Sequence, residues 1–174
     1  SQLTGNNTHL TAACNIAWSK GSFIVSSAGN SGQDSWGVVT VPANADSILT
    51  VGAVDAAINY ASFSSRGNPS VNSTLKPNVV GIGKSVYLIN DDGTIGISNG
   101  TSFSSPQIAG LVSCLIQAFP EKKNWEIKKA IENSGHNSST PDSLIGHGIP
   151  NFEIAYQILN DSSYTGITSS ITAY

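Results

Sequence analysis

The spacing of apolar residues divides the chain into helical stretches and short extended runs. Apolar side chains recur every three or four positions between residues 8 and 20, and Gly21 follows them, so this stretch is predicted to be a helix. The short apolar runs in residues 22–29 (SFIVSSAG) and 47–55 (SILTVGAVD) predict two buried strands. Residues 85–98 (SVYLINDDGTIGIS) are predicted to form a β-hairpin, because the Asp92-Gly93 pair in their middle is typical of a hairpin turn.

The second half of the chain is predicted to be mostly helical. Residues 103–119 carry apolar side chains on every helical face, which predicts a helix buried on all sides; they include Ile108, Leu111, Val112, Leu115 and Ile116. Residues 124–135 predict a surface helix with Lys128 and Lys129 pointing outward and an apolar side formed by Trp125, Ile127, Ala130 and Ile131. Residues 151–160 predict the last helix.

This order of elements indicates an α/β fold. Continuous apolar strands connected through helices favour a mostly parallel sheet that helices cover on both faces. There is no internal repeat and no break that resembles a linker, so residues 1–160 are assigned to one domain. Residues 161–174 form a Ser/Thr-rich tail.

Composition narrows the classes of function. The 174 residues are enough for one domain with a real core. Only 11% are charged, and the net charge of −3 without a basic stripe gives a nucleic-acid partner little support. The apolar runs are too short to span a membrane, and no signal segment opens the chain, although one could precede it.

The two cysteines, Cys14 and Cys114, lie in apolar helical stretches. Neither has a CxxC spacing or a histidine nearby in sequence, which argues against a metal site. Two buried free thiols are the favoured interpretation, and a disulfide is the alternative.

A small polar tripeptide, Gly100-Thr101-Ser102, stands directly before the long apolar helix. The first N–H groups of a helix have no intrahelical partner and lie at the positive end of its dipole, so they can stabilise an oxygen that becomes negative in acyl transfer. Ser102 could therefore supply both a nucleophilic hydroxyl and an oxyanion donor. Gly100 allows a substrate backbone to approach, and Pro106 is expected in the first turn of the helix. The simpler interpretation is that Ser102 or Thr101 only caps the helix.

A second polar group follows the first predicted strand, in the sequence SSAGNSG at residues 26–32. Asn30 comes at the carboxyl end of this strand, which is the edge of an open α/β sheet where ligands bind. Its NH₂ group can donate to an oxyanion without carrying charge. The alternative is that Asn30 is only a turn residue.

Taken in order, these stretches resemble the second half of subtilisin-like serine proteases. The series is SSAGNSG, VPANADSILTVGAVD, ASFSSRGNP, LKPNVVGIG and SNGTSFSSPQIAG, followed by GHGIPNFEIAYQIL near the end. The resemblance implies the three-layer fold of that family, present as a partial domain. It implies a serine endopeptidase with Ser102 as nucleophile, Asn30 as oxyanion donor and a cis peptide bond at Val41-Pro42. It also implies that the substrate contacts a set of small residues: Ser27, Ala28, Gly29, Gly100 and Thr101.

The chain departs from the family pattern in two places and lacks part of it. Gln107 stands where a non-catalytic histidine is common, and KPNVVGIG replaces the usual KPD-then-APG pattern. The Asp-Thr-Gly-like and His-Gly-Thr-like motifs that supply the carboxylate and the base are not in this sequence. His9, His136 and His147 do not fall at the position of the base. We therefore expect the carboxyl-terminal part of a longer protease, inactive as an isolated chain.

The remaining expectations concern ligands and partners. No metal cluster is evident, and residues 90–94 (NDDGT) are better explained by a hairpin turn than by a calcium loop. No cofactor is expected, although the resemblance allows calcium in the longer parent. The implied partners are polypeptide substrates in a secreted or cell-envelope setting, with self-association through an exposed sheet edge as a further expectation. The rival hypotheses are a binding module that kept the fold but lost the triad, and an interaction domain of unrelated origin.

Overall fold

A computed structural model describes residues 8–68 and 74–161. Nearly all of the predicted tail, from residue 162 onward, lies outside the described residues. The helices are α1 (His9–Ser19), α2 (Thr101–Ala118), α3 (Asn124–Asn133) and α4 (Phe152–Asn160). The strands are β1 (Val25–Ser27), β2 (Leu49–Val54), β3 (Val79–Ile82), β4 (Val86–Ile89) and β5 (Ile95–Ser98).

The centre of the fold is a parallel sheet in the order β1-β2-β3. Every residue of the middle strand β2 is buried, as expected for a continuous apolar run in a covered parallel sheet. The sequence patterns predicted β1 and β2 but no separate strand for β3. This strand has only four residues, one of them Gly81, and it follows closely on Pro77, so it carries little strand signal of its own.

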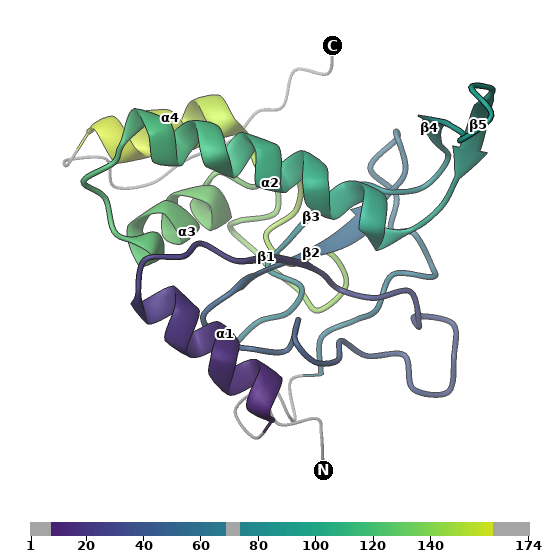
Figure 1. Cartoon of the computed structure of the whole chain (residues 1–174), viewed down its shortest axis with the longest axis horizontal. Helices are drawn as coiled ribbons and strands as arrows, with labels where there is room; N and C mark the ends of the chain where they lie inside the picture. The colour runs from purple at the N-terminus through teal and green to yellow at the C-terminus, as the bar shows by residue number, and fades with distance from the viewer. Residues whose placement is uncertain (1–7, 69–73, 162–174) are drawn as a thin grey trace.

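Helix α2 lies across one face of this sheet (Figure 1) and contacts all three strands. It approaches β3 closely because Gly81 has no side chain: a Cβ atom there would lie 3.2 Å from the Cβ atom of Ser104. Helices α3 and α4 pack against each other and extend the core away from the sheet. The continuous core includes Leu49, Val51, Val79, Ile108, Val112, Leu115, Ile127, Ile131, Ala155 and Leu159.

Some expectations of burial were wrong. Leu111 is 45% exposed and Ile116 is 36% exposed, so α2 is covered on one side rather than on every face. The cysteines are free, but Cys114 is exposed and Cys14 only half-buried. The pattern of these stretches is apolar all round, and which side is covered depends on distant segments that the pattern does not contain.

The predicted surface helix also differs in detail from its expectation. Lys128 of α3 turns inward, and its Nζ donates to the backbone oxygen of Asp46 at 2.8 Å. Trp125, expected on the packed side, is 61% exposed. Ile127 and Ile131 are buried as predicted, so the core-facing side of this helix was assigned correctly except for Trp125 and Lys128.

Strands β4 and β5 form the predicted antiparallel hairpin around Asp92-Gly93, and Figure 1 shows it at one end of the molecule. The register pairs Tyr87 with Ile97 and Ile89 with Ile95. Its position matters because β5 leads directly into Gly100 and the start of α2.

Candidate active site

The carboxyl end of β1 carries the first group of candidate residues. Strand pairing continues one residue past β1, where the Ala28 N–H donates to the Val51 oxygen at 2.8 Å. Gly29 has a φ of 104°, a conformation that favours glycine, and a Cβ atom there would lie 2.9 Å from the hydroxyl of Ser65. Ser65 in turn donates its N–H to the Gly29 oxygen at 2.8 Å. The chain is therefore held in one conformation just before Asn30.

The side chain of Asn30 is fixed by Thr101. Its Oδ1 accepts two hydrogen bonds, each 2.9 Å long, from the N–H and the hydroxyl of Thr101. The Thr101 hydroxyl also accepts from the Gly29 N–H at 3.2 Å. We call this arrangement of Gly29, Asn30 and Thr101 the Asn30 clamp. Because the amide oxygen is engaged, the NH₂ group is the part of Asn30 that is left to face a ligand.

The Asn30 clamp brings together two segments that are distant in the sequence. The Nδ2 of Asn30 lies 3.5 Å from the place where a Cβ atom on Gly100 would stand. Thr101 is 1% exposed, whereas Ser102, the next residue, is exposed. Since neighbouring Cα atoms are about 3.8 Å apart, the Asn30 amide and Ser102 occupy the same small region at the start of α2.

Helix α2 begins at Thr101, two residues earlier than predicted, with Gly100 as its N-cap. Ser102 therefore lies in the first turn, where backbone N–H groups are not used by the helix itself. Pro106 was expected in that turn, but it falls in the helix interior. The missing N–H of Pro106 removes the hydrogen bond that the Ser102 carbonyl would otherwise accept from it.

A tight backbone contact fixes the approach to Ser102. The Gly100 N–H donates to the Gly83 oxygen at 2.8 Å. A Cβ atom on Gly83 would lie 2.7 Å from the Gly100 oxygen and 2.8 Å from the Cβ atom of Ala53, which leaves no room for a side chain. The end of β3 thus sets the position of the residue that precedes Thr101.

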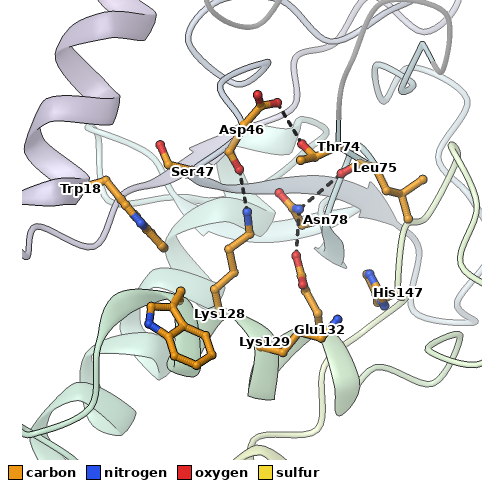
Figure 2. Close-up of a pocket in the computed structure, with 11 residues that line it drawn as sticks. Trp18, Asp46, Ser47, Thr74, Leu75, Asn78, Lys128, Lys129, Glu132 and His147 are labelled. Atoms are coloured by element: carbon orange, nitrogen blue, oxygen red, sulfur yellow. Dashed lines mark hydrogen bonds between the residues drawn. The ribbon is translucent and has the colours of Figure 1, made fainter.

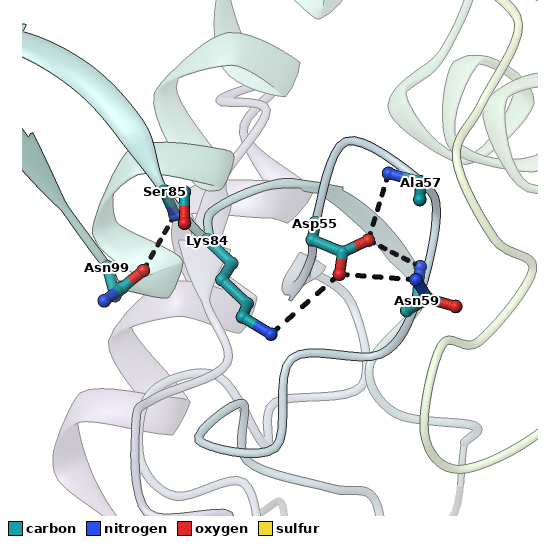
Figure 3. A network of polar contacts seen from close by, with 6 residues as sticks. All are labelled: Asp55, Ala57, Asn59, Lys84, Ser85 and Asn99. Atoms are coloured by element: carbon teal, nitrogen blue, oxygen red, sulfur yellow. Dashed lines mark hydrogen bonds and ion pairs between the residues drawn. The ribbon is translucent and has the colours of Figure 1, made fainter.

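A network of polar contacts lies next to the contact between Gly83 and Gly100, at the carboxyl ends of β2 and β3 (Figure 3). The Asn99 Oδ1 accepts from the Ser85 N–H at 2.7 Å. Hydrogen bonds from the backbone N–H of Asn59, and further bonds within the same turn, hold the pKa of Asp55 below its usual value. Lys84 lies 3.9 Å from the Asp55 carboxylate. The Asp55 carboxylate therefore serves to hold the loop that follows β2.

The three histidines lie in different surroundings in the described part of the chain. His9 is exposed at the start of α1. The His136 Nδ1 accepts from the Ile149 N–H at 2.9 Å. His147 lines a pocket of about 610 Å³, and burial is the main cause that lowers its pKa from 6.5. No hydrogen bond found within these residues connects a histidine to Ser102.

Figure 2 shows the residues that line the pocket containing His147. Its residues come from the segments that lead into β2 and β3, such as Ser47 and Asn78, and from one side of α3, including Lys128 and Glu132. Asn30 follows the carboxyl end of a parallel strand, so the pocket and the candidate active site are separated by the length of the strands.

The segment Lys76-Pro77-Asn78, where the chain departs from the family pattern, forms a buried polar network that the sequence did not predict. The Lys76 Nζ is buried and donates to three oxygens, those of the Ile48 carbonyl, the Thr50 hydroxyl and the Asn78 amide. Burial holds the pKa of Lys76 well below its usual value. Asn78 also donates to Glu132 at 3.0 Å, which connects the buried amine to a carboxylate.

Three further observations bear on the sequence predictions. The Val41-Pro42 peptide bond is cis, which confirms that expectation. The Asp92 Oδ1 accepts from both the N–H and the hydroxyl of Thr94, so it serves the hairpin turn. Across residues 8–68 and 74–161, no cluster of metal-ligating side chains is found, and no helix is both long and apolar enough to cross a bilayer.

With this geometry in place, comparison with known proteins assigns the class of the chain. A model of the subtilase family, peptidase family S8, matches residues 2–148. The chain belongs to this family of subtilisin-like serine proteases.

The similar proteins include two subtilisins. Subtilisin DY of Bacillus licheniformis is 34% identical over 153 residues, which cover 87% of this chain and 53% of that protein. Subtilisin Savinase of Lederbergia lenta is 32% identical over 146 residues, covering 84% and 50% of the two chains. This chain thus spans about half the length of these relatives.

Solved structures show the same fold. The prenylagaramide maturation protease PagA superposes with a TM-score of 0.73 at 23% identity, covering 90% of this chain and 57% of that one. The self-cleaved protease domain of PatA gives a TM-score of 0.72 at 19% identity, with 92% and 58% covered. The α/β architecture with a central parallel sheet is therefore that of a partial subtilisin-like domain.

Proposed function

We propose that Ser102 is the nucleophile of a serine endopeptidase and that Asn30 donates to the oxyanion. In this proposal the Ser102 Oγ bonds to the scissile carbonyl carbon, and its proton passes to a histidine base. The carbonyl oxygen, now negative, accepts hydrogen bonds from the Asn30 NH₂ and the Ser102 N–H. The base returns the proton to the leaving amine as the C–N bond breaks, and water then hydrolyses the acyl-enzyme.

The observation that carries the proposal is the Asn30 clamp. Two hydrogen bonds from Thr101 engage the amide oxygen, so the NH₂ group is presented to the helix start where Ser102 is exposed. The contact joins residues 71 positions apart, and it also satisfies the Thr101 N–H, for which the N-cap Gly100 supplies no side-chain acceptor. Ser27 and Gly29, which are partly exposed, are the proposed contacts of a polypeptide substrate. Ala28 and Thr101, each 1% exposed, and the buried Gly100 are proposed to support this surface from beneath.

The proposal assigns the base and its carboxylate to a segment outside residues 1–174. We also propose that the protein is secreted or located in the cell envelope, and this part of the proposal rests on the family resemblance alone. The proposed acyl transfer uses protein side chains, backbone N–H groups and water. The expectation that a longer form of the protein binds calcium stays a prediction.

Kinetics of the protein made from the complete reading frame test the assignment. In subtilisin, removal of one side-chain oxyanion donor lowers kcat about 10²–10³-fold, and we expect the same size of effect for Asn30→Ala with little change in KM. The matched control is Asn59→Ala, which removes an amide from the Asp55 loop and should change kcat less than about twofold. Peptide hydrolysis that survives Ser102→Ala would contradict the proposal, and absence of hydrolysis in the unaltered protein would favour a binding module.

A further inference from the structure

The hairpin of β4 and β5 has one face that is both apolar and exposed. Its register pairs Tyr87 with Ile97 and Ile89 with Ile95. Directly paired residues point to the same side of a sheet, and so do residues two positions apart, so these four side chains lie together on one face. Their exposed fractions run from 61% at Ile97 to 78% at Ile89. We call this set of four side chains the hairpin face.

The other described elements do not cover the hairpin face. Strands β4 and β5 make their main contacts with each other, and the hairpin projects at one end of the molecule (Figure 1). The residues of the opposite face are only half-buried: Val86, Leu88, Gly96 and Ser98. A two-stranded hairpin by itself is marginally stable in water, and a contiguous exposed apolar patch is typical of an interaction site. The hairpin face therefore has the character of a surface that binds a partner.

The charges of the hairpin restrict the kind of partner. Residues 85–98 contain no basic residue, and their only charged side chains are Asp91 and Asp92 at the turn. Membrane surfaces with anionic lipids attract basic segments, so two carboxylates at the tip of the hairpin disfavour a lipid partner. Since the hairpin face itself carries no charge, its partner has to present an uncharged, apolar and equally flat surface.

A second copy of the chain presents such a surface. Among the described strands, β1 and β2 have no exposed residue, and β3 has one, Ile82 at its end. The flat apolar surface that these strands leave exposed is thus the hairpin face itself. In a two-fold symmetric dimer the same patch of both subunits forms the interface, so a self-complementary patch is what such a dimer requires.

One two-fold arrangement also matches the charges. If the axis lies between the two stacked faces and runs across the strands, Tyr87 of each copy packs against Ile89 of the other, and Ile95 packs against Ile97. The acidic turn of each copy then lies over the open end of the other hairpin, where Lys84 precedes β4. The Lys84 side chain is 47% exposed, so it can meet these carboxylates. The two acidic turns lie at opposite ends of the interface and do not repel each other.

The size of the hairpin face determines how strong the association can be. A large aliphatic or aromatic side chain buries roughly 60–200 Å², so at the observed exposures the four side chains offer roughly 400 Å². Two such faces bury roughly 800 Å², which is below the range of about 1,200–2,000 Å² for stable interfaces and typical of weak ones. We therefore expect a reversible dimer with a dissociation constant on the order of 10–100 µM.

We propose that the hairpin face binds the same face of a second copy of this chain in a two-fold symmetric dimer. This association differs from pairing through an edge of the central sheet, because the two hairpins stack face to face and their edges stay unpaired. It does not depend on the proposed function. Because β5 leads into Gly100, the interface lies next to the segment that positions Ser102.

Sedimentation velocity tests the proposed dimer. The protein is produced from its complete reading frame with Ser102→Ala, which prevents self-digestion, and is measured from about 1 to 200 µM. We expect a monomer–dimer equilibrium whose dissociation constant rises at least tenfold with Ile89→Glu, because an unpaired carboxylate is then buried in the interface. Ile89→Thr keeps a β-branched side chain that suits the hairpin and should raise the constant at least threefold. The matched control is Ile16→Glu on α1, at a side chain that is 61% exposed, and it should change the constant less than twofold.

Two outcomes of this experiment would overturn the proposal. One is a protein that stays monomeric over the whole range of concentration, and the other is a dimer that Ile89→Glu weakens no more than Ile16→Glu does. Circular dichroism of each variant establishes that it is folded.

A lipid partner is tested with the same samples. They are sedimented with phosphatidylcholine vesicles that contain phosphatidylserine, and we expect the protein to remain in the supernatant. Vesicle binding that Ile89→Glu abolishes would overturn the proposal and make a membrane the occupant of the hairpin face. Because none of these readouts involves catalysis, a dimer of the Ser102→Ala protein whose parent hydrolyses no peptide would contradict only the proposed function.

Discussion

Replacing Thr101 by valine removes the hydroxyl of the Asn30 clamp while keeping the size of the side chain nearly unchanged. Two hydrogen bonds are lost, one to the Asn30 Oδ1 at 2.9 Å and one from the Gly29 N–H at 3.2 Å. Thr101 is 1% exposed, so water does not easily replace its hydroxyl. A lost hydrogen bond costs about 0.5–1.5 kcal/mol, and a donor left without an acceptor costs about 1–3 kcal/mol. We expect Thr101→Val to lower the free energy of unfolding by about 2–3 kcal/mol.

Urea unfolding of the 174-residue chain, followed by far-UV circular dichroism, measures this change. The control is Thr94→Val in the hairpin turn, which also removes a hydroxyl with two hydrogen bonds, to Asp92 and from Asn90, but at an exposed position. We expect a loss below about 0.5 kcal/mol for the control. Equal losses in the two variants would refute the reasoning, since they would mean that the Asn30 clamp contributes no more than a surface turn.

Two further predictions concern the surroundings of the site. Gly83→Ala should lower stability by about 1–3 kcal/mol, because its Cβ atom would overlap the Gly100 oxygen and Ala53. Gly110→Ala in α2 is the control. Nothing lies within 4 Å of the new Cβ atom, so this variant should be as stable as the unaltered chain or more stable. A Gly83→Ala variant of unchanged stability would show that the contact between Gly83 and Gly100 is not tight. His147 has a pKa below 6.5 in the folded chain, mainly through burial, with Glu132 opposing the shift and Lys129 and Lys128 adding to it. The unfolded chain then binds more protons between the folded pKa and 6.5, so stability should fall as the pH drops through this range. His147→Gln should lessen that fall in urea titrations at successive pH values, and an unchanged pH profile would contradict the assignment.

The sequence predicted the parts of the fold that local pattern controls. The mostly apolar runs around Val25 and Val51 form neighbouring strands of the parallel sheet. The Asp92-Gly93 turn and the helix after Gly100 were located from turn chemistry and helical spacing. Strand β3 was missed because its short run around Gly81 pairs with β2 through tertiary contacts rather than through a pattern of its own.

The candidate site shows the same division. Ser102 and Asn30 could be singled out because each stands at the end of a patterned element. The contact between Asn30 and Thr101 spans 71 residues, so no local rule reveals it, and Thr101 was predicted either to contact substrate or to cap the helix. The burial of α2 was overestimated for the same reason: Ile116 is 36% exposed, and the side of the helix that is covered is set by segments distant in the sequence.

The most direct test of the central claim is covalent labelling with a fluorophosphonate, with the modified peptide mapped by mass spectrometry. An activated serine reacts with this reagent, whereas a hydroxyl without a base is a poor nucleophile at neutral pH. In subtilisin, loss of the triad costs about a million-fold in turnover, so a chain without its base should be close to inert. We predict that the protein from the complete reading frame is labelled at Ser102 and that residues 1–174 alone are not. Labelling of the 174-residue chain at Ser102, abolished when His9, His136 or His147 is replaced, would contradict the claim that the base lies outside this chain.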